Sequence, residues 1–273
     1  MKFWKMHGLG NDYIVIDNRH GEIKEEVIPG LARKLCRRRF SVGSDGILLV
    51  YDSNVADVRM RMFNPDGSEA EMCGNGIRCF IKFCYENAVV SKLDPVVETL
   101  AGLKRVWLTV KDGKVVSVKV DMGKPEFDRR KIPMVGEGTF INQNLKVDGN
   151  QYNATVLSVG NPHCVIFVDN VDEFPVEDIG PKIENNALFP NRVNVEFVEV
   201  PSRRELRVRV WERGAGETLA CGTGACASVV TAKTLDKIDG LATVHLLGGD
   251  LEIEYRDRIF MTGPAEKVFE GYI

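Results

Sequence analysis

The stretch SEAEMCGNGIRCF (Ser68–Phe80) places a cysteine directly before Gly-x-Gly, where the sequence predicts the start of a helix. The stretch GETLACGTGACAS (Gly216–Ser228) repeats this arrangement at a constant offset of 148 residues. Segments 59–76 and 207–224 align without a gap, and their identical pairs are Arg59 and Arg207, Arg61 and Arg209, Glu69 and Glu217, Cys73 and Cys221, Gly74 and Gly222, and Gly76 and Gly224. Self-similarity of this length indicates a duplicated unit.

Strand patterns dominate each half of the chain. In DVRMRMF (57–63) apolar and charged residues alternate, so Val58, Met60 and Met62 share one face of a strand. Residues 105–120 alternate in the same way around Asp112–Gly113, a dipeptide typical of a two-residue hairpin turn. We therefore expect curved, mainly antiparallel sheets.

Helical patterns follow each Cys-Gly-x-Gly. After the first, Ile77, Ile81, Cys84 and Ala88 form an apolar stripe, and after the second, residues 225–232 are small or apolar on nearly all sides. A helix that is apolar all round is buried. A further amphipathic helix is expected over residues 27–38. The predicted fold class is α/β (α+β): two homologous domains related by a pseudo-twofold axis, each a curved sheet around one central helix. The cleft between them is the natural ligand site, where the duplicated cysteines would face each other.

Composition excludes several classes of function. The 273 residues carry 36 Lys and Arg against 39 Asp and Glu, a net charge of −3, which gives no sign of a nucleic-acid or membrane partner. No segment is apolar enough for a signal peptide or approaches the ~18 residues of a membrane span. Seven cysteines without a secretory signal predict reduced thiols and a cytoplasmic protein. The absence of Cys-x-x-Cys argues against a zinc site, and no metal is expected.

Two cysteines at helix starts suit one kind of chemistry. The positive end of a helix dipole lowers the pKa of a thiol, and the backbone N–H groups there bind anions. We expect both thiols to be partly ionised. If an amino-acid carboxylate lay between two such helices, one thiolate would remove the α-proton and the opposite thiol would return a proton to the other face. This inverts the stereocentre, with acid–base help of about 10²–10⁴ in rate and about 3 kcal/mol from each oxyanion donor.

Other interpretations of these residues stay open at this point. GTGACA (222–227) fits a dinucleotide-binding fingerprint, although the preceding strand ends near Glu212 and no βαβ pattern surrounds it. A thiol redox protein could use Cys73 and Cys221, although such proteins mostly use Cys-x-x-Cys. His163 is a candidate site residue because it follows an Asn at a repeated position. We expect the remaining cysteines to be small buried hydrophobes: Cys36, Cys79, Cys84, Cys164 and Cys226.

Six stretches are distributed over essentially the whole length of the chain: KMHGLGNDY, FNPDGSEAEMCGNGIRCF, GNPHCVIFVD, FPNRVNVEF, ERGAGETLACGTGACAS and MTGPAEKVFEGYI. Together they resemble the diaminopimelate epimerase family. The resemblance implies a small-molecule substrate, with interconversion of LL- and meso-diaminopimelate by two bases without pyridoxal phosphate or any other cofactor, and a homodimer. It also implies that the last strand of each half crosses to the other. We therefore predict one domain over 1–118 and 264–273, and the second over 119–263.

The resemblance implies roles for individual residues. Cys73 and Cys221 are the two bases, and His163 and Glu212 help to set their protonation. The backbone at Gly74–Asn75 and Gly222–Thr223 holds the reacting carboxylate. The side chains implied in substrate binding are Asn11, Asn64, Asn161, Asn194, Glu212 and Arg213, several of them at the far end of the substrate, where an ammonium needs a carboxylate and a carboxylate an Arg fork.

One position departs from the family pattern. Some members carry a substrate-contacting Gln where this chain has Gly46, and Gly46 offers no side chain, so it is left out of the predicted site. A proline racemase-like enzyme is the alternative inside the same fold, but WERGAGET (211–218) argues against it. A phenazine-pathway type of isomerase fits less well because that relative lacks the cysteine pair.

Overall fold

The computed structural model describes residues 1–273. The chain divides into two compact units, which are treated separately below: unit 1 is Met1–Asp121 with Thr262–Ile273, and unit 2 is Met122–Met261. The sequence places the domain boundaries after residues 118 and 263, and the contacts of the structure place them after Asp121 and Met261.

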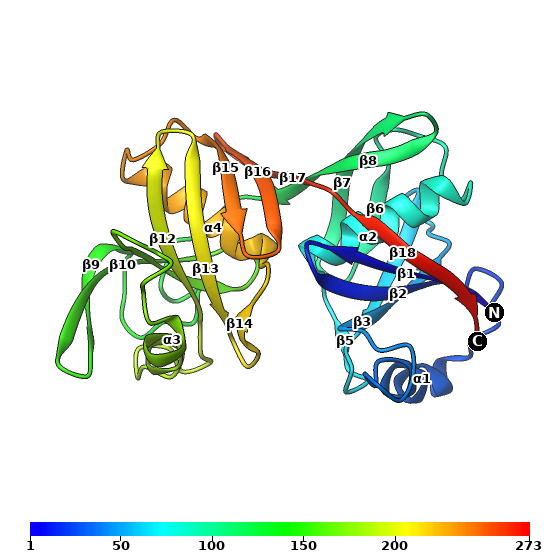
Figure 1. Ribbon diagram of the computed structural model, residues 1–273, viewed down its shortest axis with the longest axis horizontal. Coiled ribbons are helices and arrows are strands. Elements are labelled where there is room, and N and C mark those ends of the chain that lie inside the picture. Colours follow the sequence, from blue (N-terminus) through cyan, green and yellow to red (C-terminus); the bar gives the residue numbers. More distant parts are fainter. The chain divides into compact units, whose positions relative to one another are not determined.

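Unit 1 is a curved sheet with one long and one short α-helix (Figure 1). Its elements are β1 (Lys2–Gly8), β2 (Asn11–Asp17), η1 (Glu25–Val27), α1 (Ile28–Leu35), β3 (Gly46–Tyr51), β4 (Val58–Phe63), β5 (Glu69–Ala70), α2 (Gly74–Glu86), β6 (Val96–Thr99), β7 (Gly102–Lys111), β8 (Lys114–Gly123), which runs into unit 2, and the C-terminal β18 (Glu266–Tyr272).

Unit 2 also consists of a series of strands with two α-helices, and it has no counterpart of η1. Its elements are β9 (Phe140–Val147), β10 (Asn150–Ser158), β11 (Pro162–Phe167), α3 (Val176–Glu184), β12 (Asn194–Ser202), β13 (Glu205–Glu212), β14 (Gly216–Thr218), α4 (Gly222–Thr234), β15 (Leu241–Leu246), β16 (Gly249–Tyr255) and β17 (Ile259–Gly263), which leads back into unit 1.

Strand pairing follows the same order in both units. In unit 1, β1–β2 is antiparallel, β2–β3 parallel, β3–β4 and β4–β5 antiparallel, β4–β6 parallel and β6–β7 antiparallel. In unit 2, the pairs β10–β11, β11–β12, β12–β13, β13–β14, β13–β15 and β15–β16 repeat this series without exception. Each unit is therefore built on one topology, with α2 and α4 at the same place in the order.

One helix in each unit is buried against the sheet. Helix α2 contacts β1 to β4, and α4 contacts β10 to β13, β15 and β16. Ten of the thirteen residues of α4 are buried, as its all-round apolar sequence predicts. Fold class is confirmed as mixed α/β, with curved sheets and few helices.

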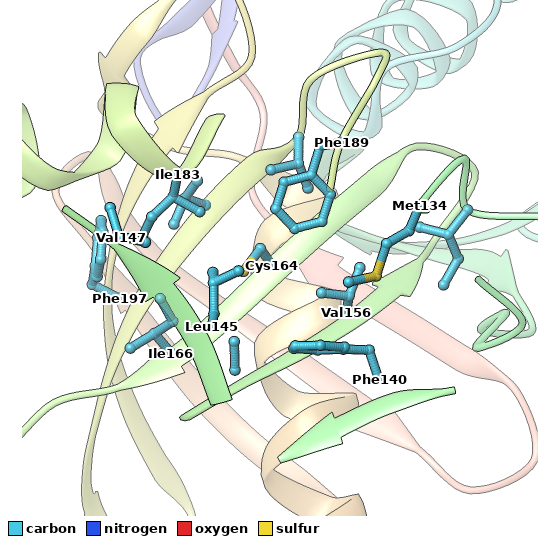
Figure 2. Close-up of a cluster of buried hydrophobic side chains, with 14 of the residues drawn as sticks. Met134, Phe140, Leu145, Val147, Val156, Cys164, Ile166, Ile183, Phe189 and Phe197 are labelled. Atoms are coloured by element: carbon cyan, nitrogen blue, oxygen red, sulfur yellow. The ribbon is translucent and has the colours of Figure 1, made fainter. Parts of the chain in front are cut away.

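The two faces of a strand serve different purposes in unit 2. Cys164 and Ile166 of β11, and Phe197 of β12, lie in a buried apolar cluster with Ile183 of α3 (Figure 2). Because side chains alternate along a strand, His163 and Glu196 are on the opposite face of the sheet. Unit 1 has a corresponding buried apolar cluster, which contains Ile14, Ile16, Ile47, Leu49 and Phe63.

Both chain termini lie in unit 1, side by side (Figure 1). Strand β18 pairs antiparallel with β1, from Lys2 opposite Tyr272 to His7 opposite Glu266. The amino group of Met1 donates a hydrogen bond to the carbonyl oxygen of Ile273 at 2.6 Å. The last strand of the sequence thus completes the sheet that the first strand begins.

Several local predictions can be checked directly. The hairpin is confirmed: β7 and β8 are joined by Asp112 and Gly113, with φ of 51° and 73°. The amphipathic helix is confirmed as α1, with Ile28 and Leu35 buried. The prediction that Ala88 belongs to the apolar stripe of α2 is wrong. Helix α2 ends at Glu86, and Ala88 is exposed with a φ of 56°. No helix has both the length and the apolar character needed to cross a membrane.

Candidate functional site

Cys73 is the N-cap residue of α2, as the sequence predicts. Its φ and ψ are −132° and 132°, so the chain is extended at Cys73 and becomes helical at Gly74. No side chain caps the helix. The thiol is half-buried and lies 3.5 Å from Oδ1 of Asn11, to which it donates. The first turn of α2 thus presents its N-terminus beside a thiol.

Asn11 is the central hydrogen-bonding residue beside Cys73. Its Nδ2 donates to Oδ2 of Asp45 at 2.8 Å. Its Oδ1 accepts from the hydroxyl of Tyr13 at 2.8 Å and from Nδ2 of Asn75 at 3.3 Å. Since a carboxylate only accepts, Asp45 fixes which end of the Asn11 amide faces Cys73. The predicted residues Asn11, Cys73 and Asn75 are therefore brought together.

Arg78 is a fully buried cation at the start of the same helix. Its guanidinium donates to the carbonyl oxygen of Gly74 and to Oδ1 of Asn75, at 3.0 and 2.9 Å, and its Nε to the carbonyl oxygen of Pro264 at 3.0 Å. The group ties the first turn of α2 to the segment before β18. We call Asn11, Tyr13, Cys73, Asn75 and Arg78 the Cys73 cluster.

Two further positions from the sequence analysis, Asn64 and Gly46, are not members of the Cys73 cluster. Asn64 follows β4, and its Nδ2 donates to Oγ of Ser68 at 3.0 Å within the same turn. Gly46 begins β3, where an added Cβ would lie 2.8 Å from the carbonyl oxygen of Phe63 and 3.3 Å from the ring of Tyr13. A side chain at position 46 would therefore require the backbone at Phe63 or the ring of Tyr13 to move.

Cys221 is the N-cap residue of α4. Its φ and ψ are −114° and 110°, and its sulfur accepts from the backbone N–H of Gly224 at 3.3 Å and lies 3.4 Å from the hydroxyl of Thr223. Gly222 and Thr223 are the first two residues of the helix. The side chain is buried. It differs from Cys73 in that its own helix supplies its hydrogen-bonding partners.

The expectation of an ionised thiol is wrong for Cys221. Burial, the largest cause, raises the pKa of Cys221 well above its usual value, and the nearby charges of Glu212 and Glu196 raise it further. The hydrogen bonds from Thr223 and Gly224 act in the opposite direction but do not prevail. Helix position alone therefore does not decide the protonation of this thiol.

Glu212 is the last residue of β13 and Arg213 follows it, beside Asn194, the first residue of β12. Oε1 of Glu212 accepts from the hydroxyl of Thr218 at 2.5 Å. Arg213 is exposed and donates one bond, to the carbonyl oxygen of Asn191 at 3.2 Å. Asn194 is buried, accepts from the backbone N–H of Arg213, and donates to the carbonyl oxygen of Pro162. The side chain of Asn194 thus links the backbone of Arg213 to that of Pro162.

His163 forms a buried pair with Glu196. Its Nδ1 lies 2.7 Å from Oε1 of Glu196, and its Nε2 lies 2.9 Å from Oδ1 of Asn161. Both members of the pair are fully buried. Oε1 of Glu196 also lies against α4, since a Cβ at Gly224 would come within 2.7 Å of it. We call Asn161, His163, Glu196, Glu212 and Cys221 the Cys221 cluster.

Three members of these two clusters were missed by sequence reasoning: Tyr13, Arg78 and Glu196. Two of them carried a visible signal, because Glu196 is a charge inside the apolar run NVEFV and Arg78 interrupts the apolar stripe of α2. Tyr13 gave none, since an aromatic residue in a strand is ordinary. No group of three or more His, Cys, Asp or Glu side chains could hold a metal ion.

The fold is shared with solved structures of low sequence identity. The chain is similar to the solved structure of a phenazine biosynthesis protein of the PhzF family from Bacillus anthracis, with a TM-score of 0.73 and 20% identity, over 100% of this chain and 98% of that one. It is also similar to a probable proline racemase from Agrobacterium radiobacter, with a TM-score of 0.71 and 15% identity, over 100% and 92%.

Curated relatives are much nearer in sequence. Diaminopimelate epimerase of Moorella thermoacetica is 50% identical over 275 residues, covering 99% of this chain and 98% of the relative. The same enzyme of Methanothermobacter thermautotrophicus is 53% identical over 279 residues, with the same coverage. The family model for diaminopimelate epimerase matches residues 3–127 and 155–268. The chain belongs to the diaminopimelate epimerase family and is an isomerase.

Proposed function

We propose that the chain interconverts LL- and meso-diaminopimelate by proton transfer between Cys73 and Cys221, as a step in making lysine and cell-wall precursors. The observation that carries the proposal is the repeated thiol: two units of the same topology each place a cysteine at the N-cap of their buried helix. The names of the curated relatives give the substrate.

In this mechanism the backbone N–H groups at the helix starts bind the substrate carboxylate. One thiolate removes the α-proton, the carboxylate becomes an enolate-like dianion held by backbone N–H groups, and the other thiol delivers a proton to the opposite face. The reverse direction exchanges the two roles. The raised pKa of Cys221 supports Cys221 as the thiol that still carries its proton when the substrate binds.

The remaining predicted residues would bind the rest of the substrate. Glu212 and the exposed guanidinium of Arg213 supply a carboxylate and a cation at the end of β13, which suits a second ammonium and a second carboxylate. Asn64, Asn161 and Asn194 would contribute amide groups, and the amides at Gly74–Asn75 and Gly222–Thr223 the carboxylate cradle. His163 would adjust the protonation of a thiol through Asn161.

The test is incubation with LL-diaminopimelate in deuterated water without added cofactor. Chiral analysis should show meso product carrying deuterium at the inverted carbon from the first turnover, because the delivered proton comes from a thiol in exchange with solvent. Product that keeps the original proton would point to one base. Proline serves as the control substrate: turnover of proline instead would move the function to the racemase alternative.

We also propose that the enzyme works in the cytoplasm as a homodimer. All seven cysteines are free, which supports a reducing compartment. Strand β18 exposes apolar side chains, among them Val268, Phe269 and Tyr272, which supports burial against a second copy. Light scattering at micromolar concentration should give a mass of two chains, and a mass of one chain would refute the dimer.

A further inference from the structure

We propose that Tyr13 is a positioning residue for Cys73. Its hydroxyl holds Asn11 while Cys73 is a thiol, and it turns to donate to the sulfur when Cys73 is a thiolate. The role of Cys73 as a base rests on the proposed function, whereas the contacts of Tyr13 do not. No motif of the sequence gave Tyr13 a role.

Tyr13 lies directly under the start of α2. It is buried on β2, and its ring packs over Gly46, whose added Cβ would lie 3.3 Å from Cε1 of the ring. A Cβ added to Gly76 would lie 3.5 Å from Cζ of Tyr13 and 3.4 Å from Cβ of Cys73. The carbon that carries the phenol oxygen and the carbon that carries the sulfur therefore flank the same point of the helix.

Three donors share one acceptor in this arrangement. The hydroxyl of Tyr13, the thiol of Cys73 and Nδ2 of Asn75 all donate to Oδ1 of Asn11, at 2.8, 3.5 and 3.3 Å. Asp45 holds the other end of that amide, so Asn11 cannot turn to offer its Nδ2. When Cys73 loses its proton, the thiolate faces an oxygen that only accepts. Tyr13 is then a donor within reach, and a hydrogen bond to a charged acceptor is stronger than one to a neutral amide.

Tyr13 acts only as a donor. Burial raises the pKa of Tyr13 well above its usual value, and the nearby charges of Cys73, Cys79 and Asp45 raise it further. The phenol therefore keeps its proton wherever a thiolate can form. The other titratable groups around Cys73 in unit 1 are Asp45 on the sheet side, and Arg78 and Cys79 from α2.

Unit 2 repeats the arrangement with a different ring. Tyr13 pairs across the sheet with Gly46, and His163 pairs with Asn194 at the same point of the topology. Each ring follows an Asn by two residues and bonds Oδ1 of that Asn, at 2.8 Å for Tyr13 and 2.9 Å for His163. A polar ring on this Asn is thus a feature of both clusters, which a chance contact of Tyr13 does not explain.

The test is to alkylate the wild-type chain and Tyr13→Phe with iodoacetamide over a range of pH, without substrate. Peptide mapping then gives the extent of alkylation at Cys73. A charged hydrogen bond is worth about 1.5–3 kcal/mol, so losing it should move the pH midpoint of Cys73 alkylation upward by about one unit or more. The midpoint should stay in place in Tyr85→Phe, which removes a phenol about 18 Å further along the same helix.

A second variant keeps the test independent of folding. Difluorotyrosine at position 13 keeps the ring and strengthens the donor, so the midpoint should move downward. A purely structural Tyr13 would leave it unchanged. Unchanged midpoints in both variants, with native circular dichroism, would overturn the proposal. Shifted midpoints in a chain that does not epimerise diaminopimelate would support Tyr13 and refute the proposed function, so the two failures are distinguishable.

Discussion

The Cys73 and Cys221 clusters share a backbone plan and differ in their buried charge. The fifth residue of the buried helix is Arg78 in α2 and Cys226 in α4, two helices of thirteen residues each. On the strand beneath, Leu48 of β3 and Glu196 of β12 occupy the same register, opposite Val15 and Val165. Unit 1 therefore buries a cation near its thiol, and unit 2 buries an anion.

This difference separates geometry from protonation. The duplicated backbone sets each cysteine at a helix N-cap, so both thiols have the same backbone setting. The charges beside them were free to diverge, and a carboxylate near a thiol favours its neutral form whereas a guanidinium favours the thiolate. Two residues of the same type thus lie near buried charges of opposite sign.

Removal of either thiol tests whether the two clusters are equally necessary. Cys73→Ala and Cys221→Ala should each reduce epimerisation by about 10³ or more, because each face of the substrate loses its acid–base group. Cys36→Ala, which removes a buried thiol at the end of α1, should keep full activity. Chiral assay of purified variants measures this, and more than a tenth of the activity left in either variant would end the two-base proposal.

Neutralising Glu196 should remove the charge that distinguishes unit 2. Glu196→Gln keeps the shape of the side chain but weakens the hold on Nδ1 of His163, so activity should fall by about ten- to a hundredfold, with a changed pH profile. Glu199→Gln, three residues further along β12 and bonded to Arg207, is the control and should stay within twofold. Equal effects of the two variants would contradict a special role of Glu196 in activity.

Added methyl groups should affect the two helices differently. A Cβ at Gly224 would meet Oε1 of Glu196 at 2.7 Å, whereas a Cβ at Gly76 has only contacts of 3.4 Å or more. Gly224→Ala should therefore cost about 1–3 kcal/mol of unfolding free energy, and Gly76→Ala about zero or a small gain, since Ala favours a helix. Urea denaturation measures both. Gly224→Ala combined with Glu196→Ala should recover part of the loss, and no recovery would mean another cause.

The smallest expected effect is in the wild-type chain itself. Because burial and two carboxylates raise the pKa of Cys221, less thiolate exists at a given pH and alkylation is slower. Iodoacetamide at pH 8 should label Cys73 several-fold faster than Cys221, and the rate at Cys221 should keep rising with pH above 9. Glu212→Gln should speed the labelling of Cys221. Faster labelling of Cys221 than of Cys73 would contradict the described charges.

The fold was largely predictable because its signals are local. Alternation along 57–63, the Asp112–Gly113 turn and the apolar residues after each Cys-Gly-x-Gly all act within a few residues, and the structure confirms each. Cys73 and Cys221 could be identified because the duplicated sequence contains the Cys-Gly-x-Gly motif twice. The roles of the site residues stay predictions.

The neighbours of the cysteines were not predictable in the same way. Tyr13 lies near Cys73, and Glu196 near Gly224, because strands distant in the sequence pair with each other. The sequence of one strand alone does not determine the register of that pairing. The thiol of Cys221 was expected to be acidic because the sequence shows a helix start but hides burial and the carboxylates beneath it. Long-range placement decided both outcomes.

The pairing of β18 with β1 has a consequence for synthesis on the ribosome. Unit 2 is one continuous segment, Met122–Met261, whereas unit 1 needs Thr262–Ile273 before its sheet is complete. Translation at about 5–20 residues per second leaves β1 without its outer neighbour for roughly 7–30 s after unit 1 first emerges. During that interval the edge of β1 is open, and the newer half of the chain can finish folding before the older half does.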